Sequence, residues 1–166
     1  MAAFSGGSRS GGVGAGRGML ALLLIAGVVE YLLGMDVNLY SSCFPDGPMH
    51  LFSSDPCGTQ SMLEAHVVVG ILLGLLAVGM LLWALRRRIP GLLVPVFGGL
   101  LGVVIAAAGG YEFLAMNQSA ADSFLMSVGF LMAFGAYFSA SLVLRDYARS
   151  GGAAVRWTPP VSPNPP

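Results

Sequence analysis

The sequence predicts an all-α membrane protein, a bundle of four transmembrane helices. Of its 166 residues, 55% are hydrophobic and 10% are charged, whereas an average soluble domain carries about 25% charged residues. Four apolar runs are separated by polar, turn-forming segments, and each run approaches the roughly 20 residues that cross a bilayer. The 24 glycines are typical of closely packed membrane helices. This composition excludes a disordered chain, a nucleic-acid-binding domain and an ordinary soluble enzyme.

The N-terminal segment, residues 1–18, is rich in glycine and serine. Such segments stay flexible, so we predict a disordered cytoplasmic tail. The first transmembrane helix is predicted over residues 19–40. Its start resembles the apolar region of a signal peptide, preceded by Arg17, but Glu30 and Tyr31 interrupt the run and no small-residue cleavage site follows. We therefore expect an uncleaved membrane helix.

An outer loop is predicted over residues 41–61, where three prolines prevent a helix. It contains both cysteines, Cys43 and Cys57, whose spacing is too wide for a CxxC metal or redox motif. In an oxidising compartment the two would most simply form one disulfide across the loop. The alternative is two free thiols.

The second helix is predicted over residues 62–85. It begins within the sequence SMLE (61–64), in which Ser61 as N-cap and Glu64 form a capping box. The sequence RRRIP ends this helix. Pro90 then suits the first turn of a third helix over residues 91–116, because a missing N–H has no consequence there.

The fourth helix is predicted over residues 122–144, after the sequence SAAD (119–122), which is also typical of a helix start. The four-helix transmembrane domain thus covers residues 19–145. The remaining segment, 146–166, is rich in proline and favours an extended polyproline conformation. We predict a cytoplasmic tail that does not pack on the bundle.

Four helices place both tails and the Arg86–Arg88 turn on the same side of the membrane. The positive-inside rule assigns that side to the cytoplasm. The cysteine loop then faces outward, where a disulfide can persist. We expect a multi-pass protein of the cell membrane, in contact with the lipid bilayer and with copies of itself or other membrane subunits, and with no nucleic acid.

The third helix resembles the first, since AGVVEYLL (26–33) aligns with AGGYEFLA (108–115). Two duplicated helical hairpins would explain this match, as in parallel-repeat transporters; chance similarity between apolar segments is the alternative. Small residues also recur every four positions, which lets helix backbones approach one another. These stripes are Gly98, Gly102, Ala106 and Gly110 in the third helix and Gly129, Ala133, Ala136 and Ala140 in the fourth.

Glu30 is the clearest candidate for a functional residue, because ionisable groups inside a membrane are costly. It lies thirteen residues past Arg17, or roughly 20 Å along a helix. It also lies midway between Ala26 and Gly34, on the face expected to point into the bundle. It could be a proton site, a metal ligand or a counter-charge. The alternative is a neutral carboxyl group that bonds to a neighbouring helix.

His66 is the one histidine in a predicted helix, and it shares a face with Gly70 and Gly74. Its imidazole could ligate haem or a metal, or relay protons. The alternative is a boundary histidine bonded to water or a neighbour. We therefore predict a cofactor site at His66 and Glu30, with the identity of the cofactor or metal left open. Whether the two residues share one site is also left open.

The other polar residues have structural explanations. Glu64 and Asp122 belong to helix starts, and Glu112 is expected near the outer surface. Tyr31 and Tyr111 fit an interfacial aromatic belt. The sequence contains no phosphate-binding glycine loop, HExxH, CxxCH or GxSxG motif. We identify no catalytic residues.

Three segments resemble small, uncharacterised four-helix integral membrane proteins of actinobacteria and archaea: EYLLGMDVNLY (30–40), EAHVVVG (64–70) and SFLMSVGFLMAFGAY (123–137). The resemblance covers about residues 20–145, and it implies the fold but no activity. A looser similarity is to four-helix haem or quinone membrane proteins, in which a histidine lies near a helix end, as His66 does.

The sequence favours a non-catalytic structural or accessory subunit of a membrane complex, because most polar residues have structural roles. One alternative is a haem- or metal-binding redox protein that uses His66 and Glu30. A second is a small proton- or cation-linked transporter with Glu30 as its ion site.

Overall fold

The computed structural model describes residues 9–39, 60–115 and 119–150. These ranges contain four α-helices and no strand, which confirms the all-α prediction. All four helices are long and apolar enough to cross a membrane. They are α1 (Arg9–Leu39), α2 (Gln60–Arg87), α3 (Leu93–Ala115) and α4 (Ala120–Arg149).

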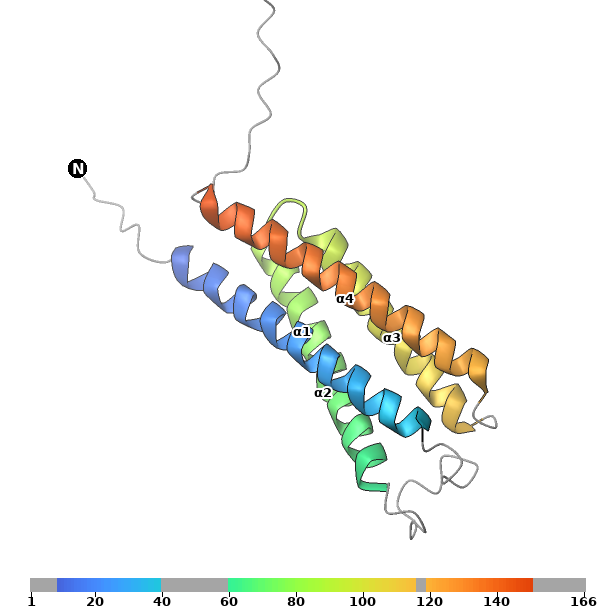
Figure 1. Ribbon diagram of the computed structural model, residues 1–166. Helices are drawn as coiled ribbons and strands as arrows, with labels where there is room; N and C mark the ends of the chain where they lie inside the picture. Colours follow the sequence, from blue (N-terminus) through green and yellow to red (C-terminus); the bar gives the residue numbers. More distant parts are fainter. Residues whose placement is uncertain (1–8, 40–59, 116–118, 151–166) are drawn as a thin grey trace, which may run out of the picture.

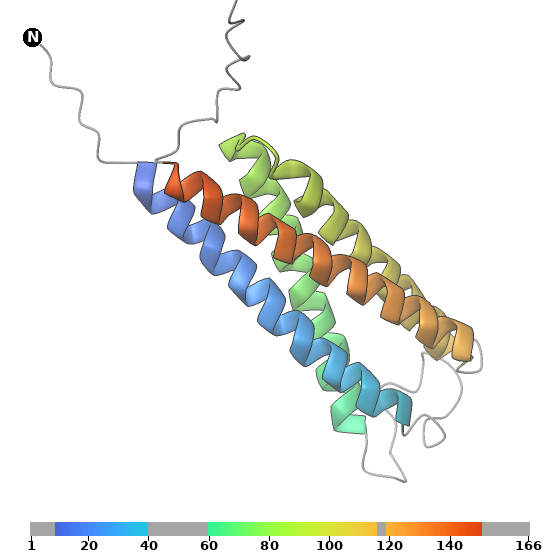
Figure 2. The same ribbon diagram turned by 45° about the horizontal axis from the view of Figure 1, so that its top comes forward.

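The helices run alternately up and down, and each packs against its neighbours in the chain, while α4 also packs against α1 (Figures 1 and 2). The beginning of α1, the turn between α2 and α3 and the end of α4 lie at one end of the bundle. The arginines gather toward this end, which we call the arginine end. Acidic residues lie toward the opposite end: Glu30, Asp36, Glu64, Glu112 and Asp122.

The closest helix pair is α3 and α4, which touch through glycine. A Cβ atom at Gly102 would lie 2.7 Å from the carbonyl oxygen of Gly129, and a Cβ atom at Gly129 would lie equally close to the Gly102 oxygen. Both positions, and Ala133, belong to the predicted stripes. On α3, however, Gly99 and Gly109 are buried, whereas the predicted Gly98 and Gly110 are half-buried. The contact face thus follows a spacing of three and seven residues through Gly99, Gly102 and Gly109 rather than a strict four-residue repeat.

The helix α1 begins at Arg9, so the predicted tail over residues 1–18 is wrong for residues 9–18. Glycine disfavours helices, but here it allows α1 to approach α2. A Cβ atom at Gly12 would overlap the Arg87 guanidinium, and one at Gly16 would overlap the Trp83 ring. Tertiary packing therefore overrides the low helix propensity of this segment.

The turn between α2 and α3 differs from the prediction. Pro90 lies within the turn, and Pro95 instead occupies the first turn of α3, which begins at Leu93. Arg88 has φ +49° and Gly91 has φ +77°. Gly91 supplies the left-handed backbone conformation that glycine adopts without strain.

The other helix boundaries differ less. Since α2 begins at Gln60, Ser61 lies in its first turn rather than at the predicted N-cap. Ser119 does cap α4, because its Oγ accepts the Asp122 N–H at 3.3 Å and donates to the Asp122 carboxylate at 2.6 Å. The helix α4 continues to Arg149, so residues 146–149 are helical and not part of a tail. The core covers part of Tyr147 there, which favours this extension.

Several predictions fall outside the described residues. These are the disulfide between Cys43 and Cys57, residues 41–59 of the outer loop predicted over 41–61, and residues 151–166 of the predicted proline-rich tail. The two hairpins are also packed differently, since glycine backbones of α3 and α4 meet directly, whereas between α1 and α2 the glycines face side chains of the opposite helix. Duplication of the hairpins stays a prediction.

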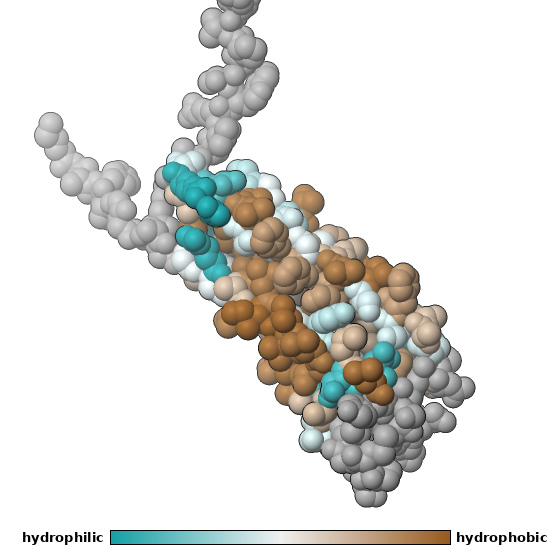
Figure 3. Space-filling model, viewed as in Figure 1, coloured by the Kyte–Doolittle hydropathy of each residue, from teal (hydrophilic) through white to brown (hydrophobic). Residues whose placement is uncertain are grey.

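The hydrophobic core lies in the arginine-end half of the bundle, where all four helices contribute buried side chains. Its largest fully buried side chains include Leu20, Met80, Leu92 and Leu144. Large apolar side chains also cover the outside of the bundle, and Figure 3 shows a broad hydrophobic band between two ends that carry hydrophilic residues. Water-soluble domains do not expose an apolar surface of this extent.

Candidate binding site at the Glu30–His66 pair

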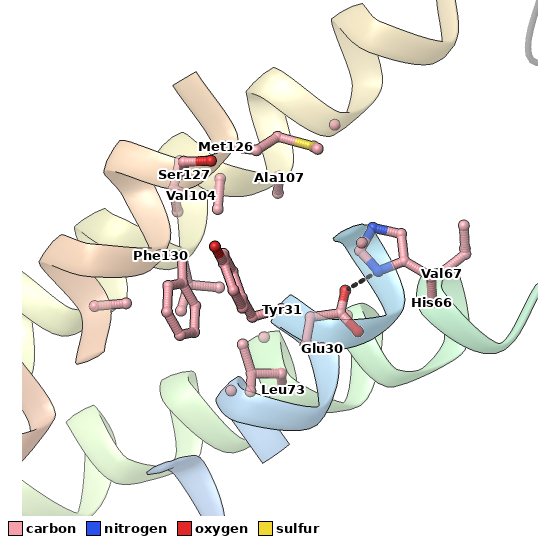
Figure 4. Close-up of a pocket in the computed structure, with 18 of the residues that line it drawn as sticks. Glu30, Tyr31, His66, Val67, Leu73, Val104, Ala107, Met126, Ser127 and Phe130 are labelled. Carbon is pink, nitrogen blue, oxygen red and sulfur yellow. Dashed lines mark ion pairs between the residues drawn. The ribbon is translucent and has the colours of Figure 1, made fainter. Parts of the chain in front are cut away.

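A cavity of about 680 Å³ lies between the four helices, beyond the core and toward the acidic end. Its volume is in the range of small-molecule sites, roughly 300–1,000 Å³. All four helices line it, and most of the lining is apolar (Figure 4). Among the described residues of the lining, Glu30 on α1 and His66 on α2 are the ionisable ones apart from tyrosines.

Glu30 and His66 form an ion pair, with Oε1 of Glu30 at 3.0 Å from Nδ1 of His66. The side chains are 18% and 21% exposed, respectively. Each residue was predicted to point into the bundle, and the structure brings the two together. Nδ1 nevertheless makes no aligned hydrogen bond, so the contact is electrostatic rather than a well-directed N–H···O bond.

Two glycines make room for this pair. A Cβ atom at Gly70 would lie 2.8 Å from Oε1 of Glu30, and one at Gly34 would lie 3.1 Å from Cε1 of His66. Gly34 follows Glu30 by one helical turn, and Gly70 follows His66 by one turn. Because α1 and α2 are antiparallel, each ionisable side chain lies over the glycine of the opposite helix. This reciprocal arrangement fixes the register at which the pair forms.

Gly70→Ala is expected to separate the pair, because the new methyl group would displace the Glu30 carboxylate. Gly74→Ala is the matched control, since nothing lies within 4 Å of a Cβ atom there. In the interior of a helix, alanine is more favourable than glycine by about 1 kcal/mol. Gly74→Ala should therefore unfold at a higher temperature than the wild type, whereas Gly70→Ala should show no such increase. Thermal unfolding in detergent and the NMR shifts of the His66 imidazole measure both effects. If the two variants had the same unfolding temperature and the same His66 shifts, the packing of Glu30 against Gly70 would be wrong.

The second carboxylate oxygen of Glu30, Oε2, is buried and has no hydrogen-bond partner among the described residues. The hydroxyl of Tyr137, which also lines the cavity, is buried and unpartnered too. Buried polar atoms without partners are uncommon in folded proteins and point to a missing ligand or water. The cavity can therefore offer an unused acceptor at Glu30 to a bound group.

An aromatic wall lies beside the ion pair. Tyr31 stacks on Phe130 of α4 with ring centroids 4.6 Å apart and planes at 25°, and Phe130 meets Phe134 at 5.9 Å. The structure adds a packing role for Tyr31, whose ring reaches α4 and whose hydroxyl points into the cavity (Figure 4); its interfacial role stays a prediction. Sequence reasoning missed this role, since only the α1–α4 packing reveals it.

The remaining acidic candidates do not join the site. Glu112 is exposed, and Asp122 is bonded to Ser119. Within the described ranges, no group of three or more histidine, cysteine, aspartate or glutamate side chains is arranged to hold a metal ion. His66 and Glu30 could supply two ligands at most among the described side chains, and further ligands would have to come from elsewhere.

The arrangement is an apolar chamber with one charged corner and one aromatic wall. It can hold an apolar molecule and fix a polar or charged group of that molecule at Glu30 and His66. Comparison of the chain with protein-family models, curated proteins and solved structures finds no match to any of them.

Proposed function

We propose that this protein is a multi-pass membrane protein that holds an amphiphilic small molecule inside its helix bundle, as a non-catalytic binding or accessory component. The observation that carries the proposal is the ion pair of Glu30 and His66 in the wall of an otherwise apolar cavity. Several lining side chains, among them Ile71, Val104 and Tyr111, are exposed, so a ligand can enter the cavity from the outside of the bundle.

Insertion into the membrane is supported by the four apolar helices and by the hydrophobic band around the bundle. The gathering of arginines at one end supports an orientation with that end in the cytoplasm. The ion pair and the mouth of the cavity would then lie in the outer half of the membrane. A ligand would reach them from the lipid or from the outer surface.

Filling the cavity is expected to abolish binding. Ala107 and the adjacent Ala108 on α3 are both exposed, but Ala107 lines the cavity and Ala108 does not. Native mass spectrometry of the protein released from detergent should show a bound small molecule in the wild type and in Ala108→Trp, and at least a tenfold lower occupancy in Ala107→Trp. If both variants lost the bound molecule, or if neither did, the proposed site would be wrong. The proposed function would also be wrong if the wild type carried no bound molecule.

Haem binding is a second candidate, favoured by the orientation of His66. Histidines that bind metals commonly donate their other ring nitrogen to a carboxylate. Here the Glu30 carboxylate lies at Nδ1, and Nε2 is on the far side of the ring from Glu30 (Figure 4). His66 could thus supply one axial ligand, and Glu30 would fix the ring orientation.

The haem alternative predicts a reduced-minus-oxidised absorbance band in the purified protein after growth with sufficient iron. His66→Ala should abolish the band, because it removes the axial nitrogen. His50 lies outside the described residues, and His50→Ala is the control for a ligand elsewhere in the chain. A colourless protein that still carries a small molecule would favour the amphiphile over haem.

A further inference from the structure

We infer that the cavity is filled by a hydrocarbon chain of a membrane lipid, which enters sideways between α2 and α3 and keeps its headgroup toward the acidic end. This inference rests on the proposed function and names the class of its ligand. Three observations carry it: an opening in one wall of the cavity, the apolar edges of that opening, and the distribution of polar residues along the cavity.

Contacts between described residues join adjacent helices at three of the four walls of the cavity. The ion pair of Glu30 and His66 joins α1 to α2, and the stacked ring of Tyr31 joins α1 to α4. The helices α3 and α4 meet through backbone atoms at Gly109. The two helices of the fourth wall, α2 and α3, instead diverge from their connecting turn toward the acidic end (Figures 1 and 2).

The wall between α2 and α3 is open at the level of the cavity. On α2, Gly74 lines the cavity, and no atom of a described residue lies within 4 Å of a Cβ atom placed there. Ile71 on α2 and Val104 and Tyr111 on α3 also line the cavity, and they are 59%, 55% and 66% exposed, respectively. The cavity is therefore accessible from the outside of the bundle between these two helices.

The edges of this opening are hydrocarbon. They are formed by Ile71 and Val78 of α2 and by Val104 and Ala107 of α3, within the apolar surface that surrounds the bundle. A water-soluble ligand would lose its hydration in passing between these side chains. A lipid chain passes without that loss, because lipid tails are as apolar as leucine. An empty cavity would also leave its lining atoms without van der Waals partners, and bilayer chains are the molecules present at this opening.

Polar residues of the lining lie toward one end, which sets the orientation of the lipid. Glu30, His66, Asn38 and Ser123 lie toward the acidic end. At the inner end the hydroxyl of Tyr137 is buried. The other inner lining side chains are mainly apolar and include Leu23, Leu100, Val103 and Ala133. This gradient matches an amphiphile whose headgroup lies at the acidic end and whose chain points toward the core.

The length of the cavity also suits one lipid chain. Along α1 the lining runs from Leu23 to Asn38, fifteen residues further on, which corresponds to about 22 Å of helix. The hydrocarbon of one leaflet is about 15 Å thick, half of the bilayer core. One extended chain therefore fits along the cavity and leaves room for polar groups beside the Glu30–His66 pair. A second chain of the same lipid stays in the bilayer outside the opening.

Quenching of a tryptophan by brominated lipid chains tests whether a chain occupies the cavity. The full-length protein, with Trp83 and Trp157 replaced by phenylalanine, is placed in nanodiscs of phosphatidylcholine with normal or dibrominated chains. Leu73→Trp puts the reporter in the cavity wall. Leu76→Trp is the matched control, because both leucines are half-buried on α2 but only Leu73 lines the cavity. We expect the fraction of fluorescence quenched to be at least twofold greater in Leu73→Trp than in Leu76→Trp.

Retention of the lipid tests the entrance between α2 and α3. Gly74→Phe places a ring in the opening. Gly135→Phe is the matched control, since a Cβ atom there also meets nothing within 4 Å and Gly135 does not line the cavity. Native mass spectrometry of the protein released from phosphatidylcholine nanodiscs should show one lipid per chain in the wild type and in Gly135→Phe, and at least tenfold lower occupancy in Gly74→Phe. Circular dichroism and gel filtration establish that each variant is folded.

Equal quenching in Leu73→Trp and Leu76→Trp would refute the lipid chain as the occupant. Equal phosphatidylcholine occupancy in Gly74→Phe and the wild type would refute entry between α2 and α3. If either result is obtained while Ala107→Trp still removes a bound small molecule, the ligand class or its route is wrong and the proposed function stands. If Ala107→Trp also has no effect, both are wrong.

Discussion

Gly129→Ala is expected to destabilise the protein by about 1–3 kcal/mol, the usual effect of overpacking a close contact. The new methyl group would lie 2.7 Å from the carbonyl oxygen of Gly102 and would overlap the backbone nitrogen of Ala106. Neither atom belongs to a side chain that can rotate away. The helices α3 and α4 would therefore have to separate along their length, and the contacts on either side would loosen with them.

The matched control is Gly135→Ala, on the same helix, where nothing lies within 4 Å of a Cβ atom. Its only effect should be the gain in helix propensity, up to about 1 kcal/mol. Unfolding of both variants by titration with a denaturing detergent, followed by circular dichroism, gives the difference. If Gly129→Ala were as stable as Gly135→Ala, the close approach of α3 and α4 would be wrong.

The α3–α4 contact was largely predictable, because a four-residue repeat of small residues marks the face where two helices can approach. The spacing identified Gly102, Gly129 and Ala133. It did not show that Gly99 and Gly109, rather than Gly98 and Gly110, complete the face. Adjacent glycines present equally small surfaces, so only the path of α4 along α3 in the assembled bundle distinguishes them.

The start of α1 could not be predicted from local propensity. Gly12 and Gly16 disfavour a helix in isolation, and the segment was interpreted as a tail. Their role appears only beside Arg87 and Trp83 of α2. Glycine in this segment reflects the closeness of a partner helix and not flexibility, a distinction that composition cannot make.

The site was predictable residue by residue but not as a pair. Small neighbours placed Glu30 and His66 on inward faces, as the structure has them. Their contact depends on the register between α1 and α2, which the packing of Glu30 over Gly70 and of His66 over Gly34 sets. The stacking of Tyr31 on Phe130 could not be predicted for the same reason, since Phe130 lies on a helix far away in the sequence.

Glu30→Gln and His66→Gln are expected each to lower stability, and the double variant is expected to lose less than the sum of the two. Removing one partner leaves the other charged group poorly compensated in an apolar surrounding, whereas removing both leaves two neutral amides. Full burial would make the loss about 3–5 kcal/mol. Because the pair is about a fifth exposed, solvent screening reduces the expected coupling to about 1–2 kcal/mol.

A double-mutant cycle measures this coupling with the same detergent titration. Asp36→Asn combined with His66→Gln serves as the reference cycle, because Asp36 is on the same helix as Glu30 but does not line the cavity. Its two effects should add. Additive effects in the Glu30–His66 cycle would mean that the 3.0 Å contact carries no net energy. A substantial coupling would show that this contact contributes to the stability of the fold. The Oε2 atom of Glu30, which has no partner among the described residues in the cavity wall, has no such stabilising contact, and this agrees with the proposed role of the site in binding.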